Sequence, residues 1–182
     1  MKNDILNLFE PINKIKHLER KGWMLKGVSG IKDTIASHSF GAASLGWLLS
    51  EMEKVDSNKV IKMLLIHDLI MAYIDDLTPA DKSYVNKEEI EKKSMEKLMK
   101  NLPAKIAREF SNLISEYQEQ KTKESIVARE ADELDTLLQA RVYSKQLNKD
   151  ILSEFLKTYH KYFKTATGKQ LWNELHEESK NL

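Results

Sequence analysis

Apolar residues recur three or four positions apart along almost the whole chain, which is the spacing of one face of an α-helix. Ile5, Phe9, Ile12 and Ile15 form the first such stripe, and Pro11 is expected to bend or interrupt the helix that carries it. No stretch alternates apolar and polar residues in the way that a half-buried strand does. The pattern therefore predicts an all-α protein, a helical bundle of seven to nine helices.

Capping residues and helix breakers set the expected boundaries of these helices. We expect one helix over residues 34–53 and another that begins after Asp56, an N-cap residue, and continues through Asp68. Residues 22–30 and 75–81 have the turn-forming composition of loops. Further helices are predicted over 86–101, from Pro103, and over 125–147, 150–163 and 168–179. No linker or internal repeat divides the chain, so a single domain over 1–182 is expected.

Composition narrows the classes of function. The chain has 182 residues with only 6 Gly and 3 Pro, which agrees with a helical fold. Its 29 basic and 28 acidic residues nearly cancel, so the sequence offers no basic field for a nucleic acid polymer. Cys is absent, which excludes thiol catalysis, a disulfide scaffold and Cys-ligated zinc.

Neither a targeting segment nor a membrane span is expected. Residues 1–20 mix charges with apolar residues, unlike the continuous apolar stretch of a signal peptide. The longest apolar window, 63–74, is interrupted by His67 and Asp68 and is too short to cross a bilayer. We therefore expect a soluble protein with no membrane partner, and the cytoplasm is the default compartment.

His67 and Asp68 interrupt the most apolar window of the chain, MLLIHDLIMAYI. Burial of a carboxylate is costly unless a partner offsets its lost hydration, and a cation would do so. Two interpretations are open at this point. The pair could be a hydrogen-bonded His–Asp pair in the core, or it could be part of a metal site.

Two further residues favour the metal site. His38 lies in another apolar helix, and Asp132 lies in the segment READELDTLLQA beside apolar Leu134. Imidazole and carboxylate groups from three helices suit a hard or borderline divalent ion and leave room for water. On a helix, His67 and Asp68 would point about 100° apart, so the ion would lie between their two directions. One divalent ion is expected, with Mn, Co, Mg, Zn and Ni all open as its identity.

The order of these residues, H…HD…D, resembles that of the HD-domain metal-dependent phosphohydrolases. The family's first His helix is similar to IASHSFGAA, its HD helix and loop to LLIHDLIMAYIDDLTPAD, and its last Asp helix to ADELDTLLQA. The Arg/Trp loop of the 5′-deoxynucleotidase branch is similar to LERKGWMLKGV. The resemblance covers residues 15–145, and the C-terminal helices are expected to pack on this HD domain or extend it.

The resemblance implies a role for each matching position. The metal ligands of the family correspond to His38, His67, Asp68 and Asp132. The loop carboxylate that helps to activate the attacking water corresponds to Asp76.

Four residues match positions that contact substrate in the family. Arg20 and Trp23 correspond to the cation and aromatic ring that contact the phosphate and the base or sugar. Asp33 and Thr34 correspond to polar contacts to phosphate or sugar just before the first His. Structural roles remain open beside these: Trp23 as a core anchor, Arg20 as a surface residue, and Thr34 as a helix N-cap.

One position departs from the family pattern. The 5′-deoxynucleotidase branch usually carries Glu three residues after the Asp of the HD pair, and Met71 stands there in this chain. A Glu at that place is a candidate acid/base, so Met71 bears on catalysis rather than on metal binding. Asp75 lies four residues beyond Met71 and would share its face of a continued helix, so we expect Asp75 to supply the missing group.

The resemblance implies a phosphomonoesterase that removes the 5′-phosphate from deoxynucleoside monophosphates, a small-molecule nucleotide substrate. Two alternatives stay open: a metal- and nucleotide-binding HD protein that is weakly active or inactive because of Met71, and an HD phosphohydrolase acting on another nucleotide. Members of the branch are commonly dimers, and a homodimer is expected here. The apolar stripe of residues 151–159 is a candidate interface, unless it packs on the chain's own core.

Overall fold

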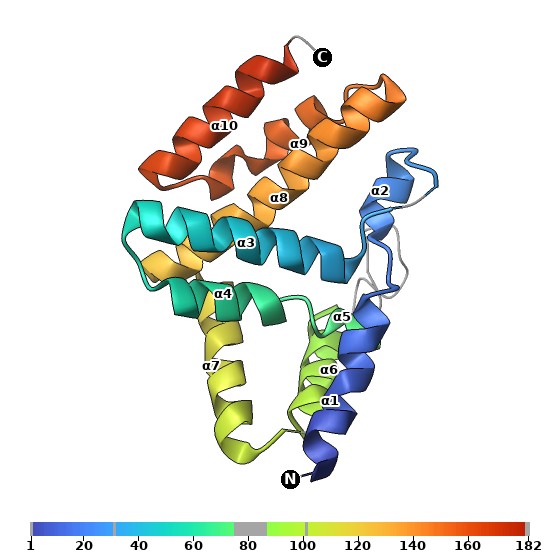
Figure 1. The fold of residues 1–182 in the computed structure, drawn as a ribbon, viewed down its shortest axis with the longest axis vertical. Coiled ribbons are helices and arrows are strands. Elements are labelled where there is room, and N and C mark those ends of the chain that lie inside the picture. The colour runs from blue at the N-terminus through green and yellow to red at the C-terminus, as the bar shows by residue number, and fades with distance from the viewer. Residues whose placement is uncertain (1, 31, 75–86, 101, 181–182) are drawn as a thin grey trace. The chain divides into compact units, whose positions relative to one another are not determined.

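The structure is a computed structural model that describes residues 2–30, 32–74, 87–100 and 102–180. Within these ranges the chain forms helices and no strand, apart from an isolated bridge between Glu19 and Thr34 (Figure 1). The all-α prediction is confirmed. The elements in chain order are α1 Lys2–Ile15, α2 Lys21–Leu25, α3 Ile35–Glu53, α4 Ser57–Ile66, α5 Met71–Ile74, α6 Lys87–Lys100, α7 Ala104–Glu119, α8 Lys123–Leu147, α9 Leu152–Tyr159, the 3-10 helix η2 His160–Tyr162, and α10 Ala166–Ser179.

Most helix boundaries lie where the capping residues predict them. The side chain of Asp56 accepts a hydrogen bond from the Lys59 backbone N–H at 3.2 Å and so caps α4. Thr122 caps α8 and exchanges hydrogen bonds with Ser125 in a capping box. Pro103 lies directly before α7, and its carbonyl accepts from the Ala107 N–H at 2.9 Å.

Two local predictions were wrong. Residues 22–30, expected to be a loop, begin with most of α2, where Trp23 is buried. The helix expected to continue through Asp68 ends at Ile66, and His67 lies in the turn that follows α4. Helix α2 and this turn are stabilised by the burial of their apolar residues against distant parts of the chain. Local helix propensity does not include that contribution, so it could not predict them. Of the two effects expected of Pro11, an interruption does not occur, because α1 runs through it, and a bend stays a prediction.

By their internal contacts the described residues divide into two compact units. Unit 1 comprises residues 1–37 and 66–115, and unit 2 comprises residues 38–65 and 116–182. The expectation of one domain over 1–182 stays a prediction.

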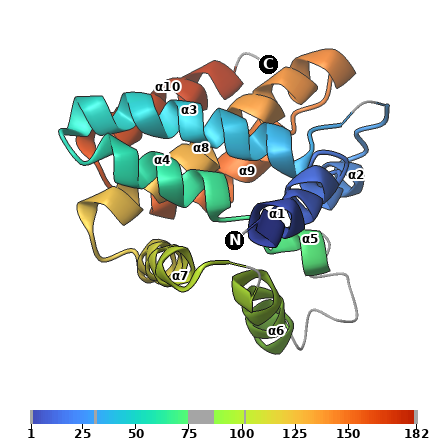
Figure 2. The ribbon, with the colours of Figure 1, turned by 60° about the horizontal axis from the view of Figure 1, so that its bottom comes forward.

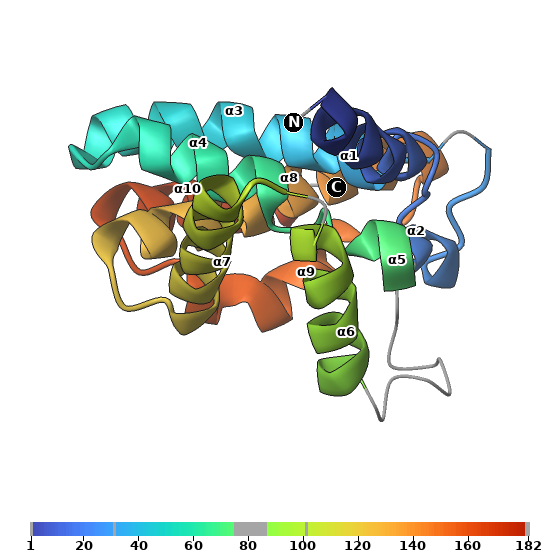
Figure 3. The same ribbon diagram turned by 90° about the horizontal axis from the view of Figure 1, so that it is seen from below.

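Unit 1 is built on an apolar cluster to which α1, α5 and α6 contribute. The short helix α5 packs on both α1 and α6 (Figure 3). The buried members of the cluster are Ile15, Ile35, Leu69, Ile70, Ala72, Ile74, Leu98, Phe110 and Ile114. Met71 is partly buried and packs against this cluster. The apolar window around the HD pair is therefore the centre of a hydrophobic core.

Unit 2 is organised around α8, which is buried on more than one side over most of its length. Both α9 and α10 pack on α8 and on each other. Helices α3 and α4 run close together within the unit (Figure 2). They can do so because Gly46 has no side chain: a Cβ there would lie 2.3 Å from a methyl carbon of Leu64. Helix α8, in contrast, is buried on more than one side and so has no single apolar face. Its buried residues therefore include polar ones.

The apolar stripe at 151–159 packs within unit 2 and is not a free interface. Ile151 and Leu152 are fully buried, and Leu156 is 1% exposed. The expectation that this stripe could bind a partner copy was wrong, because its apolar side chains are already buried in the unit that α9 and α8 share.

A buried carboxylate of α8 holds the start of α10. Glu130 is 0% exposed. It accepts hydrogen bonds from the backbone N–H groups of Lys164 at 2.5 Å and Thr165 at 2.6 Å, and from the Thr165 hydroxyl at 2.6 Å. A buried anion is tolerated because three donors replace the water that it loses.

We predict that Glu130→Ala destabilises unit 2 strongly. The substitution leaves three partly buried donors of Lys164 and Thr165 without their acceptor, and an unsatisfied buried group costs about 1–3 kcal/mol. Urea unfolding followed by circular dichroism should show a loss of about 3 kcal/mol or more. The matched control is Glu178→Ala, whose partly exposed carboxylate pairs with Arg141 and Lys145 and should cost about 1 kcal/mol or less. Equal losses for the two variants would contradict the role of Glu130.

Candidate metal centre

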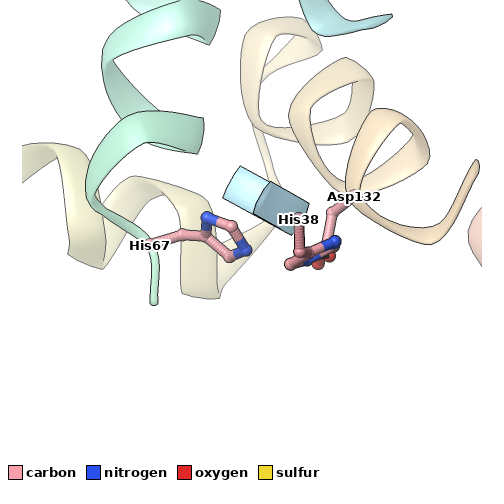
Figure 4. A group of neighbouring side chains, drawn as sticks. All are labelled: His38, His67 and Asp132. Carbon is pink, nitrogen blue, oxygen red and sulfur yellow. Dashed lines mark hydrogen bonds and ion pairs between the residues drawn. The ribbon is translucent and has the colours of Figure 1, made fainter. Parts of the chain in front are cut away.

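His38 lies in the first turns of α3 with a carboxylate at each ring nitrogen. Its Nδ1 is 2.7 Å from Oδ2 of Asp135, and its Nε2 is 2.9 Å from Oδ1 of Asp132. All three residues belong to unit 2, and both carboxylates come from α8. The His38 side chain is 0% exposed, so water cannot mediate either contact. Figure 4 shows His38 and Asp132 turned toward each other, and also draws His67 of unit 1.

A neutral imidazole carries one N–H and therefore cannot donate to both carboxylates. One of the two contacts needs an additional positive species, which is either a second proton or a metal ion. Ligand atoms about 2.0–2.2 Å from one ion and at right angles to each other lie about 3 Å apart. The 2.9 Å between Nε2 and Oδ1 of Asp132 matches that spacing. His38 and Asp132 therefore fit a divalent ion.

The second oxygen of Asp132 is already engaged. Its Oδ2 accepts a short hydrogen bond from the Tyr117 hydroxyl and another from Nη1 of Arg129 at 3.1 Å. Only Oδ1 faces His38. The carboxylate is fixed in orientation, and its free oxygen is the one that a metal could use.

Arg129 supplies the positive charge beside this cluster. Its guanidinium lies over the Tyr117 ring at 4.6 Å and the Tyr162 ring at 5.7 Å. Burial disfavours the charged guanidinium, but the Tyr117 oxygen and the carboxylates of Asp132 and Glu133 outweigh it, so the pKa of Arg129 lies above its ordinary value. Arg129 therefore stays cationic at every accessible pH and balances part of the carboxylate charge.

The HD pair belongs to unit 1. His67 is buried at 8% exposure, and its Nε2 lies 3.4 Å from Oδ2 of Asp68, whose side chain is 21% exposed. The backbone around them turns tightly, because the N–H of Leu69 donates to Ile66 O and that of Met71 to Asp68 O. The pair therefore lies in a turn and not on the continuous helix for which the 100° spacing was expected.

The four predicted substrate residues also lie in unit 1, around one short pairing of the backbone. The Arg20 N–H donates to Asp33 O at 3.0 Å, and the side chains of the two residues form an ion pair at 3.5 Å. The guanidinium of Arg20 lies over the Trp23 ring at 5.7 Å. Trp23 is 2% exposed, so it anchors the core in this arrangement and offers little ring surface to a nucleotide.

Thr34 is the N-cap of α3. Its hydroxyl accepts from the Ser37 N–H at 3.1 Å, and the Thr34 N–H donates to the Ser37 hydroxyl at 2.8 Å. The Ser37 hydroxyl also donates a short hydrogen bond to Asp33 Oδ1. The capping role that the sequence left open for Thr34 is therefore confirmed. His38 follows within one turn, so this cap fixes the start of the helix that carries it.

Two predicted residues cannot be placed. Asp75 and Asp76 lie outside the described residues. The structure describes Met71 as the first residue of α5, where its side chain packs on the core cluster of unit 1.

Three residues of the site were not expected from the sequence: Asp135, Tyr117 and Arg129. Asp135 is three positions after Asp132, on the same face of a helix, so the spacing did carry a signal. Arg129 precedes Asp132 by the same interval. Tyr117 comes from α7, fifteen residues away from Asp132, and no local pattern links the two.

The structure thus defines an all-α protein whose buried His and Asp residues could hold a metal ion. Comparison with known proteins agrees with this class. A family model described as "HD domain" matches residues 12–174. The chain belongs to the HD domain family, as the motifs around His38, His67–Asp68 and Asp132 predict.

Individual relatives point to the same branch of the family. The chain is 32% identical over 154 residues to "5′-deoxynucleotidase HDDC2" of Dictyostelium discoideum, which covers 79% of this chain and 80% of that protein. It is 27% identical over 176 residues to the Xenopus laevis protein of the same name, covering 96% and 87%. The crystal structure of the PH0347 protein from Pyrococcus horikoshii OT3 is similar, with a TM-score of 0.76, 32% identity and 99% of each chain covered.

None of the helices that the structure describes is both long enough and apolar enough to cross a membrane.

We predict that Thr34→Ala lowers stability by about 1 kcal/mol, because α3 loses the acceptor for its Ser37 N–H. Urea unfolding measures this loss. The control is Ser44→Ala on the exposed side of the same helix, whose hydroxyl bonds only the Phe40 carbonyl and which should change stability by about 0.5 kcal/mol or less. A neutral Thr34→Ala variant would argue against the cap.

Proposed function

We propose that this protein is a metal-dependent phosphohydrolase that removes the 5′-phosphate from deoxynucleoside monophosphates. The observation that carries the proposal is His38, a fully buried imidazole with a carboxylate at each ring nitrogen. Its support is membership of the HD domain family and the 5′-deoxynucleotidase names of its relatives.

His38, His67, Asp68 and Asp132 are the residues that would hold one divalent ion. His38 and Asp132 support this set through the spacing of Nε2 and Oδ1. His67 and Asp68 support it through the family pattern and through their place in the most apolar window of the chain. When bound, a divalent ion lowers the pKa of a coordinated water toward neutrality and binds the phosphate.

The chain's own residues account for the remaining steps. Asp76 takes a proton from the attacking water as the water oxygen forms a bond to phosphorus. The bond from phosphorus to O5′ breaks, and O5′ takes up the proton that Asp76 had accepted, so the products are the nucleoside alcohol and phosphate. Arg20 balances the charge on the phosphate oxygens. Asp33 orients Arg20, because it accepts from the Arg20 backbone and pairs with its side chain.

The remaining substrate residues have unequal support. Thr34 lies at the start of α3, where its hydroxyl is engaged in the cap. Contact between Trp23 and the base or sugar requires the ring to become more exposed than the 2% that the structure gives. Trp23 therefore acts on the substrate chiefly by supporting Arg20, whose guanidinium lies over the Trp23 ring.

A second candidate function is favoured by Met71. Its side chain is a thioether that packs against the hydrophobic cluster of unit 1. A thioether has no proton to give and is not a base in water, so Met71 cannot serve as the acid/base that Glu supplies at that place in the family. A positioned general acid or base typically accelerates a reaction by about 10²–10⁴-fold, and the chain would lack that acceleration. The chain would then be a weakly active or inactive nucleotide-binding protein, unless Asp75 supplies the missing group.

Phosphate release from a panel of nucleoside 5′-monophosphates decides between these functions. With Mn²⁺ or Co²⁺ added, we expect release from 5′-deoxynucleotides in preference to ribonucleotides and 3′-phosphates. His38→Ala should lose both bound metal and activity, because Asp132 then lacks its neighbouring ligand. Glu178→Gln, far along the chain on α10, should retain both.

Three outcomes of this experiment count against the proposal. A wild-type protein that binds metal and nucleotide without turnover would establish the second candidate. Preferred release from another nucleotide would establish an HD phosphohydrolase of different substrate. Full metal content in His38→Ala would show that His38 is not a ligand.

The protein forms a homodimer through the exposed face of α3 and stays in the cytoplasm. The side chains on this face are strongly exposed: Phe40 73%, Trp47 55%, Leu48 57% and Met52 62%. Beside them is an apolar groove whose lining includes Leu45, Leu48 and Leu134. Projecting apolar side chains next to an apolar groove suit a two-fold interface, in which one patch meets its own copy.

Light scattering after gel filtration tests the dimer. We expect twice the monomer mass for wild type and the monomer mass for Trp47→Glu, because a buried unpaired carboxylate opposes association. Ile106→Glu, an exposed apolar position on α7, is the control and should remain dimeric. A monomeric wild-type protein would refute the dimer.

A further inference from the structure

We infer that Asp135 is a positioning residue: it fixes the His38 ring so that Nε2 is the nitrogen presented to the metal ion. The inference rests on the proposed function, since it concerns the ion that His38 and Asp132 are proposed to hold. It assigns a role to a carboxylate that is absent from the ligand set implied by the family pattern.

The contact between the two residues is close and enclosed. Oδ2 of Asp135 lies 2.7 Å from Nδ1 of His38, at the short end of hydrogen-bond distances. The side chain of His38 is 0% exposed and that of Asp135 18% exposed. Both residues belong to unit 2, one on α3 and the other on α8. The ring is therefore held between two helices of one unit.

The carboxylate of Asp135, as an acceptor at Nδ1, determines whether Nε2 of His38 is free to bind a metal ion. An ionised carboxylate only accepts, and a metal ion between Nε2 and Asp132 would leave the one ring proton on Nδ1, where Asp135 accepts it. Nε2 then carries the lone pair, and it points at Oδ1 of Asp132 from 2.9 Å. A carboxylate behind a metal-ligating His fixes its tautomer and ring orientation and raises its basicity as a ligand.

The two carboxylates of α8 consequently have different tasks. Asp132 turns Oδ1 to the ion position while Tyr117 and Arg129 hold its Oδ2. Asp135 lies on the opposite side of the imidazole and reaches the other nitrogen. The two lie three positions apart on α8, so one helical turn presents both to the same ring.

The chain keeps space for Asp135 at a glycine. Gly41 lies three residues after His38 on α3, and a Cβ built there would be 2.1 Å from Oδ1 and 3.0 Å from Cγ of Asp135. Any side chain at this position would push the carboxylate out of its place. Gly41→Ala therefore disturbs Asp135 without removing a polar group from the site, which makes it an independent test.

The affinity of the full-length protein for Co²⁺, measured by competition with a chelator, tests the inference. Loss of a residue that supports a metal ligand typically weakens metal affinity by about 10–100-fold. We expect that loss for Asp135→Ala and a loss in the same direction for Gly41→Ala. Asp135→Asn keeps an acceptor oxygen for Nδ1 and should lose less than tenfold. Glu178→Gln, the control for removal of a charge, should bind Co²⁺ as wild type does.

The metal-free protein supplies a readout that does not depend on Co²⁺. The Nδ1 proton of a buried imidazole bonded to a carboxylate exchanges slowly with water, and proton NMR should show it as a downfield resonance. It should be present in wild type, present at a changed shift in Asp135→Asn, and absent in Asp135→Ala. Thermal melting by circular dichroism identifies any variant that is unfolded. If Asp135→Ala is unfolded, the resonance and the Co²⁺ affinity of Asp135→Asn are compared with those of wild type instead.

The outcomes separate this inference from the proposed function. If wild type binds Co²⁺ and Asp135→Ala binds it as tightly, the positioning role is wrong while the metal site stands. If Asp135→Ala and Asp135→Asn abolish binding equally, as loss of a ligand would, Asp135 is itself a ligand and the inference fails. If wild type does not bind Co²⁺, the proposed metal site fails, and the inference fails with it.

Discussion

A buried imidazole enclosed by two carboxylates is the constraint on which the rest of unit 2 depends. His38 is on α3, and both of its partners are on α8, so these helices must keep a fixed distance and rotation for the two contacts to form. Gly41 permits the approach on one side of the ring, and Tyr117 and Arg129 hold the carboxylate on the other. Because the ring of His38 is fully buried and its partners are largely so, each of these groups needs a partner, since an unpaired buried charge costs several kcal/mol.

The same requirement explains why α8 is the central helix of the unit. Over its first half it carries Glu130, Asp132 and Glu133, all buried. Glu130 binds the backbone at the start of α10, whereas Asp132 faces α3. One helix thus connects the C-terminal packing to the candidate metal centre. Its polar residues are compatible with burial because each has a specific donor.

Much of the fold could be predicted from the sequence, and the failures have physical causes. Apolar stripes located α3 and α8, and Asp56 as an N-cap located the start of α4, since capping is a local interaction. The end of α4 at Ile66 and the short helix α2 could not be predicted. Both depend on the burial of residues such as Trp23 and Leu69 in unit 1, which involves partners far away in the sequence. The apolar stripe of α9 could be seen in the sequence, but the sequence could not tell whether it packs on this chain or on a partner.

The candidate site shows the same division. His38 and Asp132 could be found because polar residues in apolar helices are costly without a function. Asp135 could have been found from its spacing to Asp132, whereas Tyr117 reaches Asp132 from another helix and left no local signal. The sequence alone also could not decide between two roles for Thr34. Hydrogen bonds to Ser37 establish the cap, and that role does not exclude a contact with substrate.

Anomalous diffraction from crystals of the protein loaded with Co²⁺ tests the central claim most directly. The account predicts one anomalous peak within about 2.3 Å of both His38 Nε2 and Asp132 Oδ1, the distance expected for a bound transition metal. Asp135 should still contact Nδ1. A peak on the Nδ1 side of the ring, or a loaded protein in which His38 retains both carboxylate contacts and the ion lies elsewhere, would contradict it.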